Sequence, residues 1–161
     1  MEYDGRSAYA RAAALGAVAG MRSVVAPAVV SHWLSRTHDA RESLRTSPLR
    51  FLGHERAAKT LRMAAAGEFV VDKLPGMPDR TEPPFIATRL AAGALAGATV
   101  ASAARRSAWI GALAGAAAAF AAAHLFMRAR RQIVRRADLP DPLVAAAEDA
   151  LAIGAGRRAL G

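Results

Sequence analysis

An uncharged run in the second half of the chain limits most strongly what this sequence can form. Residues 108–127 are twenty consecutive positions without Asp, Glu, Lys or Arg. A helix of about twenty residues is long enough to cross the roughly 30 Å hydrocarbon core of a bilayer. Trp109 lies at one end of the run, where aromatic side chains favour the membrane interface. The run therefore predicts a transmembrane helix.

The distribution of arginine points to lipid as the partner. The 161 residues carry a net charge of +9, and almost all of the positive charge is arginine. Nucleic-acid-binding proteins usually gather such residues on one face, whereas here they follow apolar runs, as in loops that contact anionic lipid. We expect a lipid bilayer as partner, with anionic lipid at these loops, and no nucleic acid. The two arginine groups are Arg36, Arg41, Arg45 and Arg50, and Arg128, Arg130, Arg131, Arg135 and Arg136.

Apolar spacing and capping residues predict an all-α fold. Arg22 and Pro27 interrupt the first apolar segment, so we expect its helix to kink or break there. Ser47 before Pro48 is typical of a helix start. We predict a polytopic transmembrane helical bundle, forming a single domain over residues 1–161, with about five helices and a broken first helix. The expected helices cover residues 7–35, 48–74, 85–104, 108–131 and 141–157.

The second expected helix is the least regular. His54, Glu55, Lys59 and Arg62 make one of its faces polar, so the sequence leaves open whether residues 48–74 span the membrane, re-enter it or lie on its surface. Five simple spans would place the two arginine groups on opposite sides, against the positive-inside rule. We therefore favour a surface or re-entrant second helix, with both groups on the cytoplasmic side.

Glycines recur four residues apart in three segments. Such pairs let helices approach closely in a membrane. We interpret them as packing within one subunit, with a homo-oligomer interface as the alternative. Their recurrence also suggests half-repeats at residues 8–80 and 85–160, as in many transporters, although an alanine- and glycine-rich chain repeats itself easily by chance. The pairs are Gly16 and Gly20, Gly93 and Gly97, and Gly111 and Gly115.

Charged residues inside apolar segments are the candidate functional residues. An arginine at the bilayer centre costs about 2.5–3.5 kcal/mol on insertion scales, so Arg22 should face the bundle interior and meet a carboxylate or unpaired carbonyls. The alternative is that Arg22 reaches an interface. We predict an intramembrane polar cluster that either serves transport or is a structural ion-pair network. Its members are Arg22, Glu68, Asp72, Glu148 and Asp149.

Enzyme chemistry has no support in the sequence. The chain contains no cysteine, phosphate-binding loop, nucleophile elbow or dinucleotide fingerprint. The histidines do not show the spacing of a zinc site. We expect no catalytic residue, no metal and no cofactor.

Several short motifs together resemble a known family. They are Gly20-Met21-Arg22-Ser23 with Pro27, Gly67-Glu68 followed by Asp72-Lys73-Leu74-Pro75, Pro78-Asp79-Arg80-Thr81, Arg89 with Gly93 and Gly97, and Glu148-Asp149-Ala150. This combination is similar to a bacterial membrane-protein family catalogued as domain of unknown function 4126. The resemblance implies a small multi-spanning membrane protein without an assigned activity, and it marks Arg22, Glu68, Asp72, Arg80 and Glu148 as positions to test. Its most specific parts are the Gly-Met-Arg-Ser turn and the loop with Lys73, Leu74 and Pro75. The polar second helix departs from the family pattern.

These features lead to a first function hypothesis and its alternatives. We expect a multi-pass protein of the bacterial inner membrane that passes a small ion or solute through the charged cluster. The alternative is a non-catalytic scaffold or assembly protein in which the charges hold the bundle together. The mean hydropathy of +0.16 is low enough that a soluble helical interaction domain is the third hypothesis.

Overall fold

The computed structural model describes residues 5–71, 83–137 and 141–160, and these ranges contain only helices and their connections. The all-α prediction is confirmed for this part of the chain. The expectation of about five helices is too low for the described residues, because two of the expected helices are divided and the short α3 was not expected. The elements are α1 (Gly5–Met21), α2 (Val25–Arg36), α3 (His38–Ser43), the 3₁₀ helix η1 (Pro48–Gly53), α4 (Glu55–Val71), α5 (Pro83–Ala103), α6 (Ala108–Ala137) and α7 (Asp141–Leu160).

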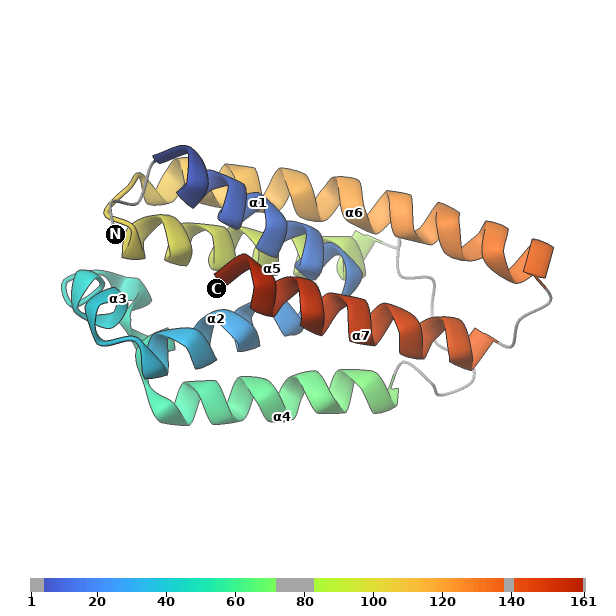
Figure 1. Cartoon of the computed structure of the whole chain (residues 1–161), viewed down its shortest axis with the longest axis horizontal. Coiled ribbons are helices and arrows are strands. Elements are labelled where there is room, and N and C mark those ends of the chain that lie inside the picture. The colour runs from blue at the N-terminus through green and yellow to red at the C-terminus, as the bar shows by residue number, and fades with distance from the viewer. Residues whose placement is uncertain (1–4, 72–82, 138–140, 161) are drawn as a thin grey trace.

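The first expected helix is a hairpin of two helices. After α1 ends at Met21, α2 begins at Val25 and runs back toward α3 (Figure 1). The start of α1 and the end of α2 therefore lie at the same end of the bundle, where Ala8 and Trp33 line one cavity. The break precedes Pro27, which lies in the first turn of α2. A proline is tolerated there because the first N–H groups of a helix have no intrahelical partner.

The segment between α2 and α4 also differs from the prediction. Ser47 does act as an N-cap, since its Oγ accepts a hydrogen bond from the N–H of Leu49 at 3.2 Å. However, it opens the short η1, and extended backbone at His54 separates η1 from α4. The hydroxyl of buried Ser31 donates to the carbonyl of Leu52. This contact between α2 and η1 is tertiary and cannot be read from local spacing.

The helices α5 and α6 form an antiparallel hairpin with an unusual turn. The N–H of Arg106 donates to the carbonyl of Ala101 at 2.8 Å, and that of Arg105 donates to Ser102 at 2.9 Å. This pair of bonds is the Schellman motif that ends many helices. Arg105 occupies the left-handed position with a φ of 54°, where glycine is the usual residue.

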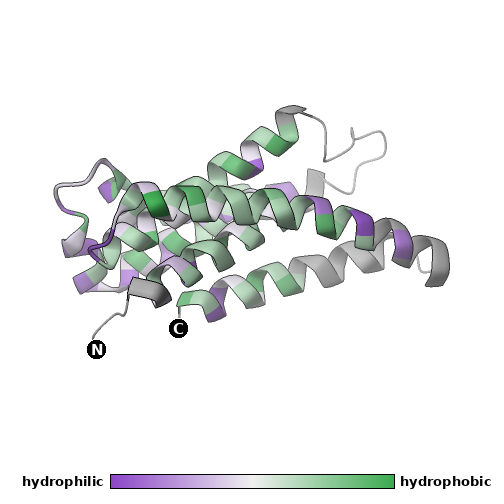
Figure 2. Cartoon of the chain, turned by 90° about the horizontal axis from the view of Figure 1, so that it is seen from above, coloured by the Kyte–Doolittle hydropathy of each residue, from purple (hydrophilic) through white to green (hydrophobic). Residues whose placement is uncertain are grey.

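Two helices are long and apolar enough to cross a membrane. The segments are Phe85–Ala103 of α5, with a mean hydropathy of 1.3, and Ala108–Ala129 of α6, with a mean hydropathy of 1.8. The helix α6 lies nearest the viewer in Figure 2, where its first part is apolar and its last part hydrophilic. The two arginine groups lie at opposite ends of the bundle, one around α3 and the other on the last part of α6 (Figure 1). This placement differs from the expectation that both groups share one side.

Candidate functional site at the broken helix

The reversal between α1 and α2 creates two helix ends inside the bundle. The last carbonyls of α1 and the first N–H groups of α2 have no intrahelical partners. We call residues 22–24 the tip of the hairpin. The N-cap residue of α2, Val24, has no side-chain oxygen to accept the N–H groups of the first turn. The tip therefore needs polar partners from other helices.

Glu68 of α4 meets the start of α2. Its Oε1 accepts hydrogen bonds from the backbone N–H of Ser23 at 3.0 Å and the hydroxyl of Ser23 at 2.7 Å. Its Oε2 accepts the N–H of Val24 at 3.0 Å. A carboxylate is favourable here because the N-terminus of a helix carries a partial positive charge. Glu68 thus does for α2 what a local capping residue does elsewhere.

Arg89 of α5 meets the end of α1. Its Nη1 donates to the carbonyl of Gly20 and to that of Met21, the latter at 3.0 Å. The Arg89 side chain is buried. A cation is favourable at the C-terminus of a helix, where the carbonyls carry a partial negative charge. The two ends at the tip are therefore each met by a side chain of opposite charge.

Arg22 lies at the tip and is 1% exposed, the largest fully buried side chain in the described part of the chain. Its backbone N–H still bonds to the carbonyl of Val18, at 2.9 Å. The neighbouring Gly20 packs on residues 119–123 of α6 so closely that an added Cβ would meet the Ala122 side chain at 2.8 Å. These α6 residues belong to the second half of the apolar stretch Ala108–Ala129, so the end of α1 packs within that stretch.

The predicted glycine pairs meet where α6 packs between α1 and α5. A Cβ at Gly16 or at Gly93 would collide with the backbone of Gly115. A Cβ at Gly97 would collide with Gly111 in the same way. Five of the six glycines thus lie against one another within the chain, and the sixth, Gly20, lies against residues 119–123 of α6.

Several predicted residues cannot be placed at the site. Asp72, Lys73, Leu74, Pro75 and Arg80 lie outside the described residues. Glu148 and Asp149 belong to α7, but their side chains also lie outside what the structure describes. Of the predicted polar cluster, the structure places only Arg22 and Glu68 at the tip. Whether the other three carboxylates join them stays a prediction.

Two residues at the tip were missed as site residues. Both Ser23 and Arg89 belong to the motifs that carry the family resemblance, but neither was predicted as a site residue. Arg89 is the sole Asp, Glu, Lys or Arg in residues 85–104, so the argument applied to Arg22 would have found it. Ser23 carries no such signal, because its role depends on the turn that brings α4 beside it.

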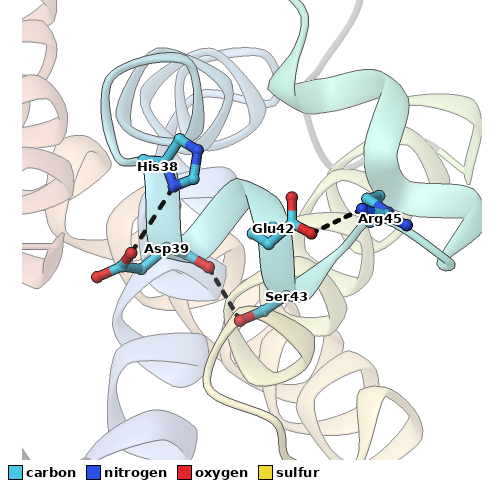
Figure 3. A network of polar contacts seen from close by, with 5 residues as sticks. All are labelled: His38, Asp39, Glu42, Ser43 and Arg45. Atoms are coloured by element: carbon cyan, nitrogen blue, oxygen red, sulfur yellow. Dashed lines mark hydrogen bonds and ion pairs between the residues drawn. The ribbon is translucent and has the colours of Figure 1, made fainter.

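The polar residues of α3 form a separate, exposed network (Figure 3). Arg45 pairs with Glu42 at 3.1 Å, and His38 lies 3.8 Å from Asp39. The hydroxyl of Ser43 donates to the carbonyl of Asp39. Exposed pairs of this kind contribute about 0–1 kcal/mol each. Over the described residues, no cluster of His, Cys, Asp and Glu is suited to hold a metal ion.

The described fold and site define an all-helical bundle with two helices apolar enough to span a membrane and a helical hairpin, α1 and α2, whose α1 packs against both of them. Residues 10–160 match the family described as domain of unknown function (DUF4126). The chain belongs to this family, and the resemblance found in its motifs is confirmed. No curated protein and no solved structure matches the chain.

Proposed function

We propose that this chain is a multi-pass protein of the bacterial inner membrane, with α5 and α6 crossing the bilayer. The support is the outer face of α6, where large apolar side chains are 50–72% exposed: Trp109, Ile110, Leu113, Phe120 and Leu125. Only 28% of its apolar window is buried, whereas a core helix of a soluble protein is mostly buried. Contiguous apolar surface of this kind mediates contact with a membrane or a partner.

Within that setting we propose a non-catalytic scaffold or assembly role, in which the charges at the tip hold the bundle together. The observation that carries this proposal is the engagement of both helix ends by the protein's own side chains. Transporters with discontinuous helices direct such ends at substrates and ions. Here the Glu68 carboxylate occupies the place at the start of α2 where a substrate anion would bind. The Arg89 guanidinium occupies the place at the end of α1 where a cation would bind.

Glu68→Gln tests this role. The amide keeps the size of the side chain, but its NH₂ group cannot accept the N–H groups of α2. A buried donor without a partner costs about 1–3 kcal/mol, so we expect a lower melting temperature of the purified protein in detergent. Glu55→Gln, at the exposed start of α4, is the control and should lower the melting temperature much less, because solvent screens the interaction of an exposed carboxylate with the helix terminus. Equal melting temperatures for both variants would contradict a structural role of Glu68.

Permeation of a small ion or solute is the second candidate function. The observation that favours it is the burial of Arg22 at a helix break, two residues beyond Gly20, which packs on the apolar stretch of α6. Non-helical backbone at membrane depth is tolerated mainly where it is covered by protein or lines a water-filled path. A flux measurement distinguishes permeation from a scaffold role. The flux of protons, alkali cations and halides is measured into vesicles that contain either the wild type or Arg22→Met. An Arg22-dependent flux through a folded protein would favour permeation over a scaffold.

A further inference from the structure

A groove on the outside of the bundle has the composition of a lipid-binding site. The helix α2 packs against both α4 and α7, and a cavity of about 230 Å³ opens where the three meet. We call it the α2 groove. Its lining is Val25, Ala28, Val29 and His32 of α2, Arg62, Ala65 and Ala66 of α4, and Ile153 and Arg157 of α7.

The apolar and basic residues of the groove are separated along the bundle axis. The helices α2 and α7 run toward the α3 end of the molecule, and α4 runs away from it (Figure 1). On each helix the basic or histidine residue therefore lies about one turn closer to the α3 end than its apolar neighbours. These residues are His32, Arg62 and Arg157, and the described residues of the lining include no Asp or Glu. One end of the groove is apolar, and the other is positively charged.

The charged end lies at the level where the membrane surface is expected. Trp33, next to His32, lines a cavity together with Ala103, the residue at which the apolar segment of α5 ends. The apolar end lies deeper, toward the tip. A phospholipid in one leaflet has this same polarity, with its phosphate at the surface and its acyl chains directed inward.

The charge of the outer end favours an anionic ligand. Burial lowers the pKa of His32, which lies in α2 and outside both candidate spans, and the positive charges of Arg36, Arg62 and Arg157 lower it further. The two arginines of this end therefore favour an anion over a cation. Arginine is well suited to bind phosphate, because its planar guanidinium donates two parallel hydrogen bonds.

We propose that the α2 groove binds one anionic phospholipid, with its phosphate at Arg62 and Arg157 and part of an acyl chain among Val29, Ala66 and Ile153. The volume is below the roughly 300 Å³ of small-ligand pockets, so the rest of the lipid lies in the bilayer. The proposal adds a specific lipid site to the membrane location proposed above, and it rests on that location.

Native mass spectrometry of the detergent-purified protein tests the site. We expect the wild type to retain one phosphatidylglycerol in preference to phosphatidylcholine, and inorganic phosphate to have no effect on retention. Each basic residue near a membrane surface strengthens the binding of anionic lipid. The double variant Arg62→Gln with Arg157→Gln should therefore weaken the retention of phosphatidylglycerol roughly thirtyfold. The matched control, Arg56→Gln with Arg158→Gln, removes the same charge from α4 and α7 outside the groove and should retain the lipid.

A second pair of variants separates the site from general charge. Ala66→Phe fills the apolar end and should abolish retention, whereas Ala64→Phe, on an exposed position outside the lining, should not. Four results would each overturn the proposal. They are equal retention of the two lipids, loss of phosphatidylglycerol from the Arg56 and Arg158 control, competition by inorganic phosphate, and binding of a second copy of the chain in place of lipid. Carbonate extraction of membranes tests the membrane location separately, so failure of one proposal is distinguishable from failure of the other.

Discussion

At the scale of residues, the interior charges of this protein act on helix ends. Glu68 and Arg89 come from different helices and meet the opposite ends of the break. An isolated carboxylate or guanidinium is costly to bury. Here each one satisfies backbone groups that would otherwise lack partners. The residue Arg105 shows the reverse case, since its backbone conformation is unfavourable for a side chain.

Replacing Arg105 by glycine should stabilise the protein. A residue with a Cβ in the left-handed region costs about 1–2 kcal/mol, and glycine avoids most of this cost. We expect Arg105→Gly to raise the melting temperature in detergent. The control is Arg106→Gly, because Arg106 is the next residue and has no positive φ. A decrease of similar size in both variants would show that the Arg105 side chain contributes more than its backbone costs.

At the scale of elements, the close contact of α6 with α1 and α5 depends on the absence of side chains. Gly115 lies against Gly16 on one side and Gly93 on the other. Without hydrophobic attraction between helices in lipid, such close packing is a main source of association. The break depends on this contact, because Gly20 packs on the next turns of α6.

Alanine substitution at two glycines should have effects of opposite sign. A Cβ at Gly115 would collide with backbone of α5, so the helices must separate, at a cost of about 1–3 kcal/mol. No atom lies within 4 Å of a Cβ at Gly154 of α7, and alanine is the better helix former by about 1 kcal/mol. We expect Gly115→Ala to lower the melting temperature and Gly154→Ala to raise it. Stabilisation by both would show that α6 has room to move.

At the scale of the whole molecule, the exposed apolar face of α6 bears on whether the protein lies in a membrane or in solution. Expression followed by washing of the membranes with alkaline carbonate should leave the protein in the pellet, because a spanning protein needs detergent for release. A high-salt wash is the control for a chain held only by its basic charge. Release by carbonate would contradict the membrane proposal, and the exposed face of α6 would then need a protein partner.

The depth of α6 in the bilayer can be tested by two arginine substitutions on its exposed face. Phe120 lies near the middle of Ala108–Ala129 and Trp109 at its end. An arginine costs about 2.5–3.5 kcal/mol at the centre of a membrane helix and much less near the interface. We expect Phe120→Arg to reduce the amount of carbonate-resistant protein and Trp109→Arg to leave it unchanged. Equal amounts for both would place α6 outside the bilayer.

Periodicity, composition and caps were sufficient to predict an all-α chain, the starts and approximate lengths of α5, α6 and α7, and a break near Arg22. These features are local, since they depend on residues within a few turns of one another. The motifs were also sufficient to identify the family.

Only the tertiary structure showed that the chain reverses at residues 22–24 and that Glu68 and Arg89 meet the two helix ends there. It also showed that the expected helix 48–74 is interrupted at His54, two residues after Leu52, whose carbonyl accepts a hydrogen bond from Ser31. The physical reason is the same in both cases. Hydrogen bonds between residues tens of positions apart decide which helix ends are satisfied, and local spacing contains no information about those partners.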